Sequence, residues 1–218
     1  MFYKQKLKCG GSTIAEGIAV KEIGSIPYSH IKDKIDSAIS VSDTSIEQAI
    51  AMLALTEKVV VEGAGAVGLA AIIENQKKFK NKNVGIILCG GNIDSKILSS
   101  ILMRDLVRAR QITTMTITMP DKPGQLHIIS KICANSGANV LRVEHNRFTI
   151  DLSASLAKLD ITIETQNEDH LKSIINLIEK EGLPVTFDDN NWNYWLTFTK
   201  LSKGLRLDFI LWKISKFL

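Results

Sequence analysis

The chain has 218 residues, 45% of them hydrophobic and 23% charged, which is ordinary for a globular protein with one large domain or two small ones. Three cysteines are too few and too irregularly spaced for a disulfide framework, and four histidines without ligand spacing argue against a metal site built from His and Cys. The net charge of +4 falls within residues 191–218, where five basic residues accompany one acid, so the body of the chain offers no basic face to nucleic acid.

Residues 35–110 alternate between helix and strand patterns. Thr44 and Glu47 match a capping box, in which the two residues satisfy each other's orphan amides, at the start of a helix predicted over 46–58. An apolar strand at 59–61 follows this helix and leads into a glycine-rich segment.

Two more helices and one more strand complete this block. The first of these helices covers 67–78. Residues 83–91 form a continuous apolar run that ends in glycines, which is typical of a central parallel strand buried on both faces. The last helix covers 92–109, with Asn92 or Asp94 as its N-cap. Strands alternating with helices predict an α/β fold with a parallel sheet.

A different pattern begins at Gln111, where the predicted order becomes βαββαβ. Alternating apolar and polar residues mark the strands, and amphipathic spacing with glycine stops marks the helices. The predicted elements are a strand at 112–120, a helix within 121–137, strands at 138–148 and 151–165, a helix at 168–182 and a strand at 183–189. This order predicts a ferredoxin-like unit.

Gly63, Gly65 and Gly68 match the G-x-G-x-x-G fingerprint of a dinucleotide site. Such a site also needs an acid at the tip of the next strand, and here that strand ends in Cys89-Gly90-Gly91. We therefore expect the fingerprint to be accidental. Gly-Ala-Gly at a helix start either offers bare amides to an anionic or aromatic ligand or permits close helix–sheet packing, and the spacing leaves both interpretations open.

Three motifs together resemble threonine dehydratase, also called threonine ammonia-lyase, of the fold-type-II pyridoxal-phosphate family. They are GGSTIAEGIAV (10–20), VVVEGAGAVGLAAI (59–72) and ILCGGNID (87–94). The unit that contains TITMPDKPGQLHII and SGANVLRVEHNR resembles an ACT domain, the amino-acid-sensing module of many such enzymes. The resemblance implies part of a parallel-sheet, tryptophan synthase β-like domain followed by a βαββαβ ACT domain, with pyridoxal 5'-phosphate as cofactor.

The resemblance also implies roles for particular residues. Cys89 stands where the family's Ser or Cys hydrogen-bonds the pyridine nitrogen of the cofactor, and Gly90 follows it in the same turn. Glu62 matches the family's glutamate beside the ring, with Gly63 and Ala64 as the adjoining wall. A neutral partner for the nitrogen leaves the ring largely unprotonated, which suits β-elimination.

The chain departs from the family at three points. Many relatives have A-D-G where this chain has Ala15-Glu16-Gly17, so the carboxylate is one methylene further from the backbone. The family's Schiff-base lysine lies in an S-F-K-x-R-G-type motif and its phosphate loop is G-G-G-G-L-like, and neither motif occurs here. We therefore expect no catalytic residue in this chain and interpret it as the C-terminal half of the enzyme.

The expected organisation has three parts. Residues 1–110 are the C-terminal part of the lyase domain, 111–189 the ACT regulatory domain, and 190–218 a basic, apolar tail. The resemblance implies conversion of threonine to 2-oxobutanoate and ammonia, for isoleucine biosynthesis, together with a complementing N-terminal half or in a homo-oligomer. A stand-alone ACT module and an inactive remnant are the alternatives.

The ACT resemblance also implies an effector site for a small amino acid. Asp121 and Gly124 flank a turn into a helix whose first amides are free to bind a carboxylate, and Asn139 reaches the ligand's amine from a paired domain. Without a ligand the same D-K-P-G segment is simply a turn with Pro at its second position.

The tail from 190 to 218 mixes apolar and basic residues, and its uncharged runs are too short to cross a bilayer. It is interpreted as an interfacial helix, as a helix packing on the body, or as an extension past a shifted stop codon. We favour the last and expect no membrane contact. Because the N-terminus shows no export signal, we expect a cytoplasmic protein.

Overall fold

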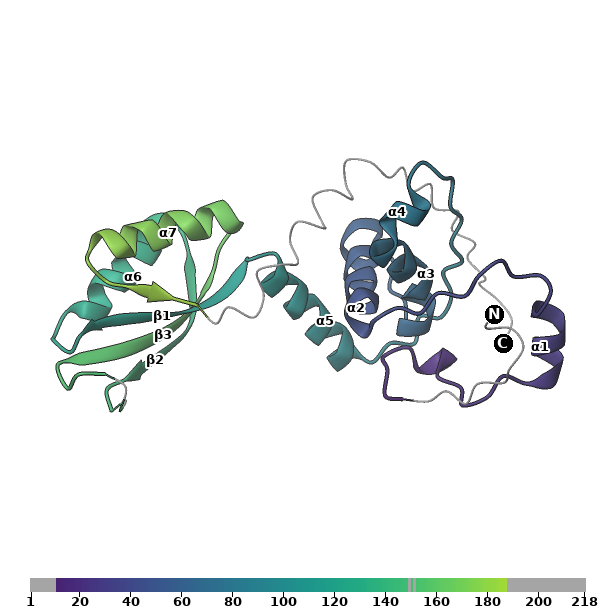
Figure 1. Cartoon of the computed structure of the whole chain (residues 1–218). Coiled ribbons are helices and arrows are strands. Elements are labelled where there is room, and N and C mark those ends of the chain that lie inside the picture. The colour runs from purple at the N-terminus through teal and green to yellow at the C-terminus, as the bar shows by residue number, and fades with distance from the viewer. Residues whose placement is uncertain (1–10, 149, 151, 188–218) are drawn as a thin grey trace. The chain divides into compact units, whose positions relative to one another are not determined.

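The computed structural model describes residues 11–148, 150 and 152–187 (Figure 1). Contacts divide the chain into two compact units, one up to Leu102 and one from Met103. The division falls inside the helix α5, Ser95–Arg108. The tail predicted at 190–218 lies outside the described residues.

The first unit is helical. Its elements are η2 (Glu16–Ile18), α1 (Ser25–Ile31), α2 (Asp43–Met52), a π-helical segment (Leu53–Glu57), α3 (Gly63–Glu74), α4 (Gln76–Phe79) and the start of α5. α2 packs against α3. The apolar face predicted for α2 is buried, with Ile46, Ile50 and Leu53 each at most 2% exposed. The helix pair is therefore the core of this unit.

The N-cap of α2 is Ser42, so the capping box predicted at Thr44 and Glu47 is wrong. The Ser42 hydroxyl accepts a hydrogen bond from the Ser45 amide at 3.2 Å, and it donates to Glu74 Oε1 at 2.6 Å. The helix begins at Asp43, one residue before Thr44, because Ser42 already satisfies the first free amides and also ties α2 to the end of α3.

The strands predicted at 59–61 and 83–91 are not formed within residues 11–102. Their carboxyl ends do meet, because the Glu62 amide donates to the Gly90 carbonyl at 2.9 Å. The burial predicted on both faces of 83–91 is also wrong, since Ile87 is 88% exposed. A single hydrogen bond makes no ladder, and a buried strand needs partners on both sides and layers above and below.

The second unit is the βαββαβ unit predicted from the sequence. Its elements are β1 (Ile112–Pro120), α6 (Gln125–Ser136), β2 (Asn139–Asn146), β3 (Leu156–Glu164), α7 (Glu168–Lys180) and β4 (Val185–Thr186). The strands form one antiparallel sheet in the order β2-β3-β1-β4 (Figure 1). The ferredoxin-like topology is thereby confirmed.

The two faces of this sheet differ. On the face covered by α6 and α7, alternate residues of β1 and β3 are buried with apolar residues of the helices (Met115, Ile117, Met119, Ala157, Leu159, Ile161, Ile163, Ile129, Cys133, Leu171, Ile174 and Ile178). On the other face Thr114 bonds Thr162 at 2.8 Å, and the Asp160 carboxylate accepts hydrogen bonds from Thr116 and Asn146. The unit thus closes its own core on one side and leaves a polar surface on the other.

Several helix ends follow the sequence signals. Asp94 caps α5, its carboxylate accepting from the amides of Lys96 at 2.8 Å and Ile97 at 3.1 Å. Gly137 ends α6 in the left-handed conformation, with φ of 76°. These caps fix the points at which the chain turns from helix to loop.

Candidate functional site

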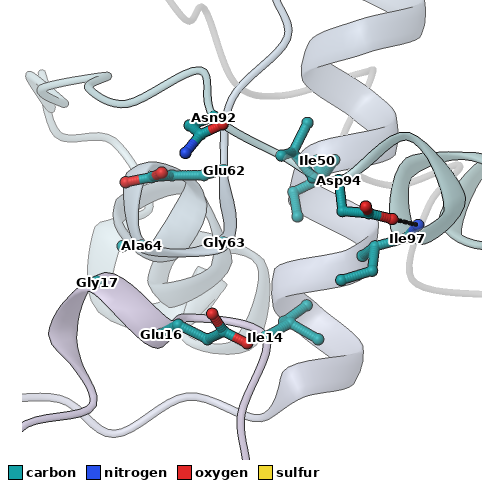
Figure 2. Close-up of a pocket in the computed structure, with 11 residues that line it drawn as sticks. Ile14, Glu16, Gly17, Ile50, Glu62, Gly63, Ala64, Asn92, Asp94 and Ile97 are labelled. Carbon is teal, nitrogen blue, oxygen red and sulfur yellow. Dashed lines mark hydrogen bonds between the residues drawn. The ribbon is translucent and has the colours of Figure 1, made fainter.

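A cavity of about 220 Å³ lies in the first unit where three segments converge. Figure 2 shows its walls, which come from the segment before and within η2, from α2 and the start of α3, and from the segment that leads into α5. The lining residues are Ile14, Glu16, Gly17, Ile50, Glu62, Gly63, Ala64, Asn92, Ile93, Asp94 and Ile97. This volume is below the roughly 300–1,000 Å³ of a complete small-molecule site, so these residues form only part of one.

Glu62, Gly63 and Ala64 lie together in this wall, as the resemblance predicted. Glu62 is the N-cap residue of α3 with extended backbone, and its carboxylate makes no capping bond to the helix amides. Figure 2 shows this carboxylate at the edge of the cavity. The position suits a negative charge, because the helix dipole is positive at its N-terminus.

Two glycines of α3 permit close backbone contacts that no other residue could make. A Cβ on Gly63 would lie 2.1 Å from the Ile14 carbonyl oxygen, and one on Gly65 would lie 1.9 Å from that of Cys89. The obstacles are backbone atoms, so rotation of a side chain cannot relieve them. The glycine fingerprint therefore serves the packing of α3 against both neighbouring segments.

Gly90 joins this group through Glu62. Its φ is 70°, and a Cβ there would lie 2.2 Å from Glu62 Oε1. Cys89 is exposed and does not belong to the cavity lining; only its carbonyl contacts the site, at Gly65. The structure thus brings Glu62, Gly63, Ala64 and Gly90 together and places the Cys89 backbone beside them.

Sequence reasoning missed three lining residues. Asn92 and Asp94 were considered only as helix caps, and both line the cavity. Ile97 adds an apolar wall one turn into α5. The signal available was that the turn after Cys89 continues directly into a helix, which places that helix start beside α3.

The cavity is acidic. Its lining includes the carboxylates of Glu16, Glu62 and Asp94, and among the residues given for it there is no lysine or arginine. A phosphate group would meet repulsion here rather than a positive partner. A neutral or nitrogen-bearing ring edge fits this wall, while the phosphate and the aldehyde of pyridoxal phosphate find no partner in it.

The predicted effector residues occupy two ends of the second unit. Asp121 forms an ion pair with Arg147 at 3.2 Å, and Gly124 stands at the start of α6 with φ of 96°. Asn139 opens β2, and its amide donates to Glu164 at 3.3 Å.

The strand pairing sets the separation between these two ends. Pro120 pairs with Leu156 at one end of β3, while Asn139 pairs with Glu164 at the other end. Eight residues of strand span about 26 Å. Asp121 and Asn139 of one copy therefore cannot contact the same small amino acid.

Metal binding and membrane crossing find no support in the part of the chain that the structure describes. No three His, Cys, Asp or Glu side chains gather there as a metal ligand set would. None of the helices described is both long enough and apolar enough to pass through a bilayer.

Comparison with protein families matches residues 3–90 to the model "Pyridoxal-phosphate dependent enzyme". This segment belongs to that family. The match contains η2, α2, α3 and most of the cavity wall. The resemblance predicted from the three motifs is confirmed, and with it the dependence of the family on pyridoxal phosphate.

Two curated relatives of the family extend the match beyond this segment. The chain is 38% identical over 177 residues to the L-threonine ammonia-lyase of Thermotoga maritima, covering 81% of this chain and 44% of that protein. It is 32% identical over 170 residues to the L-threonine ammonia-lyase of Geobacter sulfurreducens, covering 78% and 42%. The chain spans less than half the length of these relatives.

A solved structure is also similar. It is a threonine deaminase from the organism abbreviated T.th., which is 28% identical with a TM-score of 0.38, over 41% of this chain and 32% of that one.

Proposed function

We propose that this chain forms part of a pyridoxal-phosphate-dependent threonine ammonia-lyase that converts threonine to 2-oxobutanoate and ammonia. The supporting observation is the 38% identity over 177 residues to a protein of that name. An alignment of that length is longer than the first unit, so it includes residues of both units. Both the cavity wall and at least part of the βαββαβ unit therefore have counterparts in the relative.

The residues of the cavity wall would hold one edge of the cofactor. When bound, pyridoxal phosphate supplies a ring that withdraws electrons from the substrate's α-carbon. We assign the ring nitrogen to the Cys89 thiol and place the Glu62 carboxylate beside the ring. Gly63, Ala64 and Gly90, which carry small side chains or none, leave space for the ring face.

The βαββαβ unit, within residues 111–189, is proposed to sense a small amino acid. The amides at the start of α6, after Asp121 and Gly124, suit the ligand's carboxylate. Because Asn139 of the same copy lies at the far end of the sheet, its contribution requires a second copy of the unit. The closed core of this unit also favours the second candidate function, an amino-acid-binding module that works without the lyase domain.

A chimera tests the lyase assignment. The part of the Thermotoga maritima enzyme that aligns with this chain is replaced by residues 11–187, and threonine deamination is followed as 2-oxobutanoate. We expect activity in the folded chimera and no activity from the 218-residue chain alone, because none of its lysines follows Ser-Phe.

Matched variants locate the site within the chimera. Glu62→Ala and Cys89→Ala should each lower kcat at least tenfold, while Glu57→Ala should leave kcat unchanged. A folded chimera that binds pyridoxal phosphate but does not deaminate threonine would reject the proposed reaction. Equal effects of the three substitutions would reject the site.

A further inference from the structure

The strand β2 lies at an edge of the four-stranded sheet. In the order β2-β3-β1-β4 it pairs with β3 on one side, and no strand in the described part of the chain covers its other side. It carries neither proline nor lysine, which natural proteins use to blunt such edges. Leu141 and Val143 are 47% and 42% exposed on it. An open edge with exposed apolar residues is a template for another strand.

The charges of β2 form a short pattern around Val143. Arg142 and Glu144 pair with Thr162 and Asp160 of β3 and so share the polar face of the sheet. Both charged side chains are well exposed and form an ion pair within the copy. Val143 points to the opposite face.

We propose that β2 pairs antiparallel with β2 of a second copy of this chain, about a two-fold axis at Val143. Residues directly opposite each other in an antiparallel pair point to the same face of the sheet. In this register Arg142 faces Glu144 of the second copy, and the symmetry repeats the pair. The two Val143 side chains face each other on the helix side. The result is a continuous sheet of eight strands.

The neighbouring registers are disfavoured by charge. A two-fold axis at Arg142 would place two arginines opposite each other, and an axis at Glu144 would do the same with two glutamates. A bulge between Val140 and Arg142 disturbs the pairing at the beginning of β2, so the regular stretch from Arg142 onward dominates the contact. The charge pattern therefore selects both the partner, which is another copy, and the register.

This pairing also bears on the effector site proposed above, on which only this consequence depends. Arg147, just after β2, forms the ion pair with Asp121. The antiparallel register directs Asn139 of the second copy toward this end of the strand. The Asp121 turn and an asparagine from the second copy would then flank one site, which neither copy can form alone.

Charge reversal and charge exchange test the pairing on the full chain. Arg142→Glu brings like charges together in both symmetric pairs and should raise the dimer dissociation constant about tenfold or more, measured by sedimentation velocity. The exchanged variant, Arg142→Glu with Glu144→Arg, restores opposite charges and should return the dissociation constant to within about threefold of the original. Lys180→Glu, at the end of α7, makes the same change in net charge and should have no effect.

Cross-linking tests the register. In a chain with Cys9→Ser and Cys89→Ser, Val143→Cys should give a covalent dimer on mild oxidation, because the two thiols meet at the axis. Ser173→Cys, exposed on α7, serves as the control and should give none. Circular dichroism confirms that each variant is folded.

Three results would overturn the proposal: a monomer at all concentrations, failure of the exchanged variant to restore association, or equal cross-linking at positions 143 and 173. None of these measurements uses threonine or pyridoxal phosphate, so a failure here is distinct from a failure of the lyase assignment.

Discussion

Replacing Gly65 with alanine tests whether the glycines of α3 are packing residues. The new Cβ would lie 1.9 Å from the Cys89 carbonyl oxygen, which belongs to the backbone. Overpacking of this kind costs about 1–3 kcal/mol, and a backbone contact this short places the cost at the upper end. Alanine gains about 1 kcal/mol over glycine in a helix, so we expect a net loss of about 2 kcal/mol in local stability.

Hydrogen-exchange mass spectrometry measures this loss where it occurs. A loss of about 2 kcal/mol corresponds to roughly 30-fold faster exchange at amides of α3 and of residues 86–91. Peptides from β1 and β3 provide an internal reference, since the second unit has its own core. The matched control is Gly85→Ala, because nothing lies within 4 Å of a Cβ at that position. Unchanged or slower exchange in Gly65→Ala, or equal effects of the two substitutions, would refute the packing argument.

Two further predictions concern titratable groups. Burial raises the pKa of the Cys133 thiol, so at about pH 8 iodoacetamide should label the exposed Cys89 at least tenfold faster than Cys133 in folded protein, as peptide mapping would show, and equal rates would contradict the buried position. Hydrogen bonds from the side chain and then the backbone of Ser42 lower the pKa of Glu74; this link contributes stability above the ordinary glutamate pKa and is lost as the pH falls through the lowered value. Glu74→Gln should therefore weaken the pH dependence of exchange in α2 and α3 below about pH 4.3, and an unchanged pH profile would show that the contact does not contribute.

The second unit could be predicted from the sequence because its order is recorded in local alternation. Met115, Ile117 and Met119 recur at every second position, and the helices that cover them follow within the same short stretch. Every strand finds its partner inside the unit, so local patterns and tertiary structure agree.

The first unit shows where this reasoning ends. The apolar run around Ile87 has the composition of a buried strand, yet burial depends on neighbours that the described residues do not supply. The cap of α2 was misplaced because Ser42, Thr44 and Ser45 are all good caps, and only the path of the backbone decides among them. Asn92 entered the site through the meeting of two distant segments, which no local pattern records.

The contrast between the two faces of the βαββαβ sheet also bears on how the chain folds. A slip of one residue between β1 and β3 would turn Met115, Ile117 and Met119 toward water and place Thr114 and Thr116 beneath the helices. Each buried hydroxyl would lose its partner, and three large apolar side chains would lose their burial. Misaligned hairpins are thus unstable from the moment they form, and they dissolve before α6 and α7 can dock and trap them. The threonines on the open face in this way reject errors during folding, although in the finished protein they bury almost nothing.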